Sequence, residues 1–133
     1  MRALIASAAA GVALLAGAAQ AAPRHDPELR LAKLLDGRVA GEPRDCIPLR
    51  STTRSHVIDG TAIVFDIGGT RWVNRPRAGA EDLDRSDTLV YRTTISRLCS
   101  VDVVRTFDTS ARIQTGTVFL GEWVPYRKVR QGG

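Results

Sequence analysis

The sequence predicts a mainly β protein: a small antiparallel sandwich or barrel of about six to seven short strands with one short N-terminal helix. From residue 46 onward, short runs rich in Val, Ile, Thr and aromatic residues alternate with Gly-containing turn signals, which is typical of antiparallel strands. Between residues 26 and 37, apolar residues instead recur at helical spacing. These patterns do not decide between a sandwich and a barrel.

The predicted helix has a start signal, an apolar face and a stop signal. Asp26 can cap it, Pro27 suits its first turn, Glu28 favours the positive end of the helix dipole, and Gly37 can end it. Three leucines share one face at helical spacing: Leu31, Leu34 and Leu35. We therefore expect this helix to pack against the rest of the domain rather than to bind a partner.

The predicted strands lie between polar loops and tight turns. Asp59-Gly60 and Gly68-Gly69 are hairpin signals, so the strands around them should form a three-strand meander. Residues 37–45, 75–87 and 108–116 are expected to be loops or turns. The expected strands are residues 46–49, 55–58, 61–67, 70–74, 88–96, 97–107 and 117–126, the last of them broken by Gly121.

The first 21 residues resemble a cleavable secretory signal peptide. Residues 1–2 supply a positive charge, residues 3–19 are apolar, and residues 19–21 form an A-x-A cleavage site. The alternative is a membrane anchor, but a spanning helix needs roughly 20 strongly apolar residues and this run is mostly Ala and Gly. We expect a periplasmic or secreted protein with no stable membrane span after cleavage.

The remaining chain is long enough for one domain with a modest core. We expect residues 22–26 to be a flexible leader, residues 27–126 a single β-rich domain, and residues 127–133 a basic flexible tail. No low-complexity tract occurs beyond the leader peptide.

Cys46 and Cys99 are the two cysteines of the chain. An even number of cysteines in an exported protein predicts a disulfide. A metal site would need further ligands, and neither His25 nor His56 has a suitable spacing to the cysteines. A C-x-x-C redox motif is also missing. We therefore predict a Cys46–Cys99 disulfide, no metal and no cofactor.

Residues 66–70, with the sequence DIGGT, match the phosphate-binding turn of sugar kinases with the actin and hexokinase ATPase fold. The likeness covers five residues, and that family needs a second lobe for its other nucleotide motifs. A Gly-Gly pair is also what a tight hairpin requires, because glycine readily adopts positive φ. The turn is therefore interpreted as a hairpin and not as a nucleotide site.

Two further patterns partly resemble functional sites. Asp82 and Asp84 begin like a calcium loop, but its sixth and twelfth positions are Asp87 and Thr93 instead of Gly and Glu. The loop is expected to be solvated and to hold surface ion pairs. His56 has Asp59 nearby, but the chain has no G-x-S-x-G motif, so no catalytic residue is assigned and enzymatic activity is not favoured.

The basic residues give the one predicted contact surface. The chain has a net charge of +5, and arginine makes up all but two of its 19 basic residues. Arginine suits phosphate and carboxylate binding, although the codon bias of a GC-rich genome is the favoured explanation for its abundance. Arg71, Trp72, Arg75 and Arg77 are the candidate binding residues. In an extended segment, Arg71 and Arg75 should lie on one face and Trp72 on the other. An anionic envelope component or another periplasmic protein is the expected partner; nucleic acid is not, because extra aromatic stacking residues are missing.

Residues 30–126 resemble a group of small exported alphaproteobacterial proteins of uncharacterised activity. The likeness is carried by Cys46-Ile47, Asp59-Gly60-Thr61, Cys99 and Val124-Pro125-Tyr126. It implies an exported domain with paired cysteines and brings no catalytic residues. The function expected from the sequence is a binding or structural module of the bacterial envelope, with a periplasmic hydrolase, or an inhibitor of one, as the alternative.

Overall fold

The computed structural model describes residue 17 and residues 26–130. The predicted signal peptide and leader lie outside these residues except for Gly17 and Asp26, and so do residues 131–133 of the predicted tail. The described part contains one α-helix, a 3-10 turn and ten strands, so the predicted mainly β fold with one N-terminal helix is confirmed. None of its helices is long and apolar enough to cross a membrane.

The elements follow one another along the chain as α1, ten β-strands and the short turn η1. Their bounds are α1 Pro27–Leu34, β1 Arg38–Ala40, β2 Cys46–Pro48, β3 Thr52–Ile58, β4 Ala62–Ile67, β5 Thr70–Asn74, η1 Ala80–Asp82, β6 Thr88–Tyr91, β7 Arg97–Cys99, β8 Val103–Asp108, β9 Ile113–Phe119 and β10 Trp123–Lys128.

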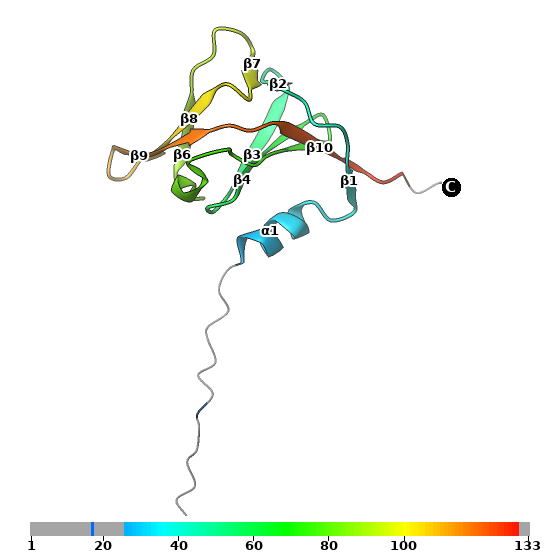
Figure 1. Cartoon of the computed structure of the whole chain (residues 1–133), viewed down its shortest axis with the longest axis horizontal. Helices are drawn as coiled ribbons and strands as arrows, with labels where there is room; N and C mark the ends of the chain where they lie inside the picture. The colour runs from blue at the N-terminus through cyan, green and yellow to red at the C-terminus, as the bar shows by residue number, and fades with distance from the viewer. Residues whose placement is uncertain (1–16, 18–25, 131–133) are drawn as a thin grey trace, which may run out of the picture.

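The strands form three antiparallel sheets arranged as the layers of a small β sandwich. The largest sheet has the order β1-β10-β5-β4-β3, a second has the order β6-β8-β9, and β2 pairs with β7. Helix α1 lies on one side of the strand layers, and the β2–β7 ladder lies on the opposite side (Figure 1). The five-stranded sheet is therefore the middle layer, with α1 on its outer face.

Two apolar clusters correspond to these layers. The inner cluster lies between the sheets and contains Phe65 and Trp123, whose rings stack with centroids 5.4 Å apart. The second cluster joins α1 to the outer face of the five-stranded sheet and contains Leu31, Ala62 and Val64. Consecutive residues of β4 enter opposite clusters because side chains alternate across a strand. All of β4 except Asp66 is therefore buried.

Both predicted Gly-containing turns are confirmed. Gly60 has φ +60° between β3 and β4. Gly68 and Gly69 have φ +55° and +80°, and the flanking Ile67 and Thr70 are paired across the hairpin. A two-residue turn with positive φ at both positions matches the twist of its strands and favours glycine. The DIGGT sequence is thus accounted for by the β4–β5 hairpin.

Helix α1 begins and packs as the sequence predicts. The Asp26 carboxylate accepts hydrogen bonds from the backbone N–H groups of Glu28 and Leu29, at 2.9 and 3.4 Å. Leu31 is buried against the sheet, and the two other leucines of the predicted face pack partly against the same cluster. Gly37 follows the helix with φ +69°.

The predicted strand count of six to seven was too low, because two predicted strands are each split and β1 lies in a predicted loop. Residues 97–107 were expected to form one strand, but a turn at Ser100–Val101 separates β7 from β8, which belong to different sheets. Residues 117–126 likewise divide into parts of β9 and β10. Strand-forming residues lie on both sides of each break, so the sequence does not show where the chain leaves one sheet and enters another.

Four predicted boundaries were also wrong. The predicted turn at residues 108–116 is too long, because β8 ends at Asp108 and β9 begins at Ile113. The predicted loop at residues 37–45 contains β1, and the predicted strand at residues 88–96 ends at Tyr91. Strand β10 continues through Lys128, two residues into the predicted tail, because it pairs with β1. Pairing with a distant partner sets these limits.

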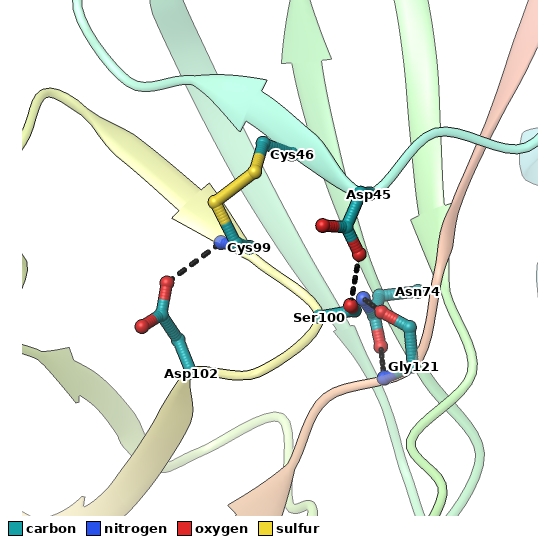
Figure 2. Close-up of a disulfide and its surroundings, with 7 residues drawn as sticks. All are labelled: Asp45, Cys46, Asn74, Cys99, Ser100, Asp102 and Gly121. Carbon is teal, nitrogen blue, oxygen red and sulfur yellow. Dashed lines mark hydrogen bonds between the residues drawn. A yellow bond between two sulfur atoms is a disulfide. The ribbon is translucent and has the colours of Figure 1, made fainter.

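The predicted Cys46–Cys99 disulfide is present. The two cysteines are direct partners in the β2–β7 ladder, with Cα atoms 4.0 Å apart. Figure 2 shows two hydrogen bonds that hold the same region: Cys99 N–H donates to the Asp102 carboxylate, and the Ser100 hydroxyl donates to Asp45. A disulfide is typical of proteins in oxidising compartments.

The break at Gly121 has a local cause that the sequence did not show. The buried Asn74 amide donates to the Gly121 carbonyl at 2.7 Å and accepts from the Gly121 N–H at 2.9 Å (Figure 2). A Cβ at residue 121 would lie 2.4 Å from the Arg75 carbonyl oxygen. The chain therefore needs glycine here to pass close to β5 between β9 and β10.

Candidate functional site

A pocket of about 310 Å³ lies between α1 and the outer face of the five-stranded sheet. Its lining residues come from three elements: Arg30, Lys33 and Leu34 from α1, His56 and Ile58 from β3, and Arg71 from β5. Four of these six side chains are basic, and the other two are apolar. The site therefore combines cationic groups with a partly apolar floor.

The strand alternation explains why these side chains meet. His56 and Ile58 lie two residues apart on β3 and share one face, while Val57 packs into the inner cluster. Asp66 of β4 is the direct cross-strand partner of Arg71. Both therefore lie on the face covered by α1, which ends close to them.

A carboxylate connects the two sheet-borne basic groups of the pocket. His56 Nε2 lies 3.1 Å from Asp66 Oδ2, and Arg71 Nε donates to Asp66 Oδ1 at 3.2 Å. Arg71 Nη1 also donates to the Leu34 carbonyl oxygen near the end of α1. That carbonyl is one of those that a helix C-terminus leaves without an intrahelical partner. Arg71 thus fixes α1 to the sheet while keeping further N–H donors.

The pocket carries an excess of positive charge. Arg30 and Lys33 lie one turn apart on α1, and neither side chain has a hydrogen-bond or ion-pair partner within residues 26–130. With Arg71, three permanent cations line the pocket, and of these Arg71 is bound to the Asp66 carboxylate. Cationic groups that line a concave site attract anions, and arginine and lysine both bind phosphate and carboxylate oxygens.

The four predicted binding residues do not form one surface. Arg71 and Arg75 face α1, as the alternation predicted, whereas Trp72 lies on the opposite face of β5 and packs against the inner cluster. The Arg127 guanidinium lies 5.9 Å from the Trp72 ring centroid. Arg77 lies in the loop after β5, and its side chain is exposed. A ligand-binding role for this set stays a prediction.

Arg75 is bound to the helix rather than to the pocket. Its Nη1 and Nη2 donate to the two Glu28 carboxylate oxygens at 2.8 and 3.0 Å. The hydrogen bonds from Arg75 lower the pKa of Glu28, and the same bonds raise the pKa of Arg75. This bidentate pair joins the start of α1 to the end of β5, so Arg71 and Arg75 hold the two ends of the helix.

The acidic loop uses its carboxylates for internal hydrogen bonds. Asp84 accepts hydrogen bonds from the Ser86 hydroxyl and from the Ser86 backbone N–H, the latter at 2.8 Å, and these two bonds lower the pKa of Asp84. Asp82 accepts from the Thr117 N–H at 3.3 Å. Outside the loop, Asp59 forms an ion pair with Arg85. Within the described residues, no group of three His, Cys, Asp or Glu side chains could hold a metal ion.

Sequence reasoning found Arg71 and His56 but did not join them into one site. Arg30 and Lys33 were not singled out, and Asp66 was considered only as part of the DIGGT turn. A signal for the two helical residues was available: they lie beside the predicted apolar face, so they should project at its border. Their position over β3 depends on how α1 lies on the sheet, which the sequence does not give.

Comparison of the chain with protein-family models, with curated proteins and with solved structures finds no match in any of the three.

Proposed function

We propose that this domain is an anion-binding module of the bacterial envelope, and that the pocket between α1 and β3 is its binding site. The observation that carries the proposal is the convergence of Arg30, Lys33 and Arg71 on one pocket whose lining residues include no carboxylate. The nearby Asp66 carboxylate is already bound to His56 and Arg71. The ligand class that fits is a small anion or an anionic group of a larger molecule, such as a phosphate or carboxylate.

Export belongs to the same proposal. The signal-like first 21 residues predict a periplasmic or secreted location, and the disulfide is consistent with an oxidising compartment. In that compartment the domain would meet phosphorylated and carboxylated envelope components. The pocket is large enough to enclose one such group, and its apolar residues Leu34 and Ile58 would contact the group's carbon skeleton.

Isothermal titration calorimetry with sodium pyrophosphate tests the site. Lys33→Gln and Arg30→Gln each remove one cation from α1, and each should weaken binding about tenfold, or ~1.4 kcal/mol, as expected for a charge-assisted hydrogen bond. Lys128→Gln and Arg130→Gln are matched controls, because they remove the same charge from exposed positions outside the pocket.

The affinities of the pocket variants and the control variants together show whether the anion binds in the pocket. If Lys33→Gln and Lys128→Gln lower the affinity equally, the protein attracts anions only through its net charge and the assignment of the pocket is wrong. Wild-type protein that gives no saturable heat would contradict the proposal. Amide chemical shifts that change on β3 and α1 during the titration would locate the anion in the pocket.

The His56–Asp66 pair favours hydrolysis as the second candidate function. An aspartate at 3.1 Å orients the imidazole ring, as required of a general base, and the ring reaches the pocket. The described lining residues include no serine, threonine or cysteine, so His56 would have to activate water directly. Hydrolysis of p-nitrophenyl phosphate or acetate that is lost in His56→Asn would support this function; equal rates in both proteins would exclude it.

A further inference from the structure

The outer face of the three-stranded sheet is exposed and carries both apolar and cationic side chains. Val90 of β6, Val103 of β8 and Phe119 of β9 are 40%, 36% and 39% exposed. The ladder register makes Val103 the direct partner of Phe119, and Val90 the direct partner of Arg105. A pocket of about 490 Å³ lies on this face, lined in part by Phe107.

The charge on this face is positive. Arg92 and Arg105 both line the pocket, and neither side chain has a hydrogen-bond or ion-pair partner among the described residues. Arg105 lies opposite Val90 in the ladder, and both arginines line the pocket together with Val90 and Val103. A second copy of the same face would bring four arginines together, which charge repulsion opposes. The complementary partner therefore carries carboxylates next to apolar side chains.

Strand β6 gives this face an open edge. It pairs only with β8, and its residues 88–91 make no backbone hydrogen bond to other described segments. The opposite edge of the sheet is covered, because Phe119 exchanges backbone hydrogen bonds with Arg77 and Ala78 at 3.0 and 2.9 Å. An unpaired strand edge can accept an added strand.

Strand β3, an edge of the five-stranded sheet, is longer than β6 but less suited to strand addition. Strand β3 has a register shift between Thr52 and Arg54 and carries a charged side chain at that point. Bulges and charges are the features that protect sheet edges from pairing. The four residues of β6 have neither a charge nor a proline, and its ladder with β8 is regular. Strand addition is therefore favoured at β6.

We propose that β6 binds an extended acidic segment of a partner protein as an additional antiparallel or parallel strand. An added strand would lie about 4.8 Å from β6. Its side chains would alternate between the two faces of the sheet, so every second residue would lie on the outer face near Arg92 and Val90. Glutamate or aspartate at those positions would pair with Arg92 and reach toward Arg105. This site is separate from the pocket beneath α1 and does not depend on its function.

Fluorescence anisotropy with two labelled peptides tests the inference, using the protein with its disulfide intact. The probes are an alternating Glu-Val octapeptide and the corresponding Lys-Val octapeptide. We expect the Glu-Val peptide to bind and the Lys-Val peptide to bind at least about tenfold more weakly, because opposite charges across an interface set specificity. The double variant Arg92→Glu/Arg105→Glu should reverse this preference.

The matched control is Arg44→Glu/Arg130→Glu, which changes the net charge equally at exposed positions away from β6. A control that loses the Glu-Val peptide as completely as the β6 variant would overturn the proposal, as would equal binding of both peptides to the wild type. Hydrogen exchange supplies an independent readout: bound peptide should protect β6 amides. Unchanged β6 exchange with bound peptide would exclude strand addition, and binding of anionic phosphatidylglycerol vesicles but not of the peptide would identify a membrane contact instead.

Discussion

The two outer faces of the sandwich differ in what covers them. On the five-stranded sheet, Ala62 and Val64 are fully buried beneath α1, a helix that the chain itself supplies. On the three-stranded sheet, Val90 and Val103 remain more than one third exposed beside unpaired arginines. Both faces belong to the same fold and both carry valines. The difference is that only one of them has its cover within residues 26–130.

This contrast distinguishes arginines that hold the fold together from arginines that are free to bind a partner. On the covered face, Arg71 and Arg75 hold the ends of α1 through Asp66, the Leu34 carbonyl and Glu28. On the open face, the arginines have no such partners in the described part of the chain. Arginine content alone therefore does not identify a binding surface. What distinguishes the two sets is whether the fold already provides their acceptors.

Removing the disulfide should have the largest effect on stability, because it crosslinks the domain to which both faces belong. Cys46→Ala with Cys99→Ala should lower the free energy of unfolding by about 4 kcal/mol in the chain-entropy model, because the bond closes a loop with a sequence separation of 53. Urea unfolding with and without reductant measures this effect. In the double variant, the reductant should not lower the free energy of unfolding any further. A second loss of the same size would show that the reductant does not act through this disulfide.

Removing the cover of the closed face should have the next largest effect. Leu31 is 3% exposed on the sheet-facing side of α1, so Leu31→Ala should cost about 2–3 kcal/mol through lost burial and an unfilled cavity. Leu29→Ala is the matched control, since Leu29 is on the same helix and 54% exposed. Equal midpoints of urea unfolding for the two variants would show that α1 does not cover the sheet.

The Arg71 hydrogen bonds at the C-terminal end of α1 should contribute less to stability than Leu31 does. Arg71→Gln removes the donors to Asp66 and to the Leu34 carbonyl, which should lower stability by about 1–2 kcal/mol. Arg71→Lys keeps the charge but cannot donate to both acceptors in the same geometry, so it should restore only part of the loss. Thermal unfolding measures both variants, and complete rescue by lysine would show that charge alone suffices.

The features predicted correctly from the sequence are those set by neighbouring residues. Asp26 and Pro27 mark the start of α1 through local capping, and the positive φ of Gly68 and Gly69 follows from the demands of a two-residue hairpin. The alternation of Arg71 and Trp72 across β5 was also predicted, because it depends only on strand geometry. The disulfide followed from composition and its expected compartment.

The features missed from the sequence depend on contacts distant along the chain. Strand β1 exists because residues 38–40 pair with the end of β10, and the Asn74 amide is buried because Gly121 passes beside it. The basic pocket forms only when α1 places Lys33 above β3. Each of these three features depends on how two elements lie relative to each other, and the local sequence pattern does not determine that arrangement.

The clamp at the start of α1 should give a small, pH-dependent effect. Arg75 lowers the pKa of Glu28 in the folded protein, so the stabilisation is present above the unfolded-state value near 4.5 and is lost as the pH falls through the lowered folded-state pKa. Both side chains are more than half exposed, so Glu28→Gln should cost only about 0.5 kcal/mol at pH 7. The difference between wild type and variant should disappear in urea unfolding at low pH; a constant difference would exclude the ion pair as its source.

The open face should give the smallest change in stability and so complete the contrast with the covered one. Val103→Thr exchanges an apolar for a polar β-branched side chain at a position 36% exposed, and it should alter the free energy of unfolding by less than about 0.5 kcal/mol. Val64→Thr, the same exchange beneath α1, should be clearly destabilising because it buries a hydroxyl at a position 0% exposed. If Val103→Thr cost as much as Val64→Thr in urea unfolding, the outer face of the three-stranded sheet would be covered in solution, and its arginines would not be available to a partner.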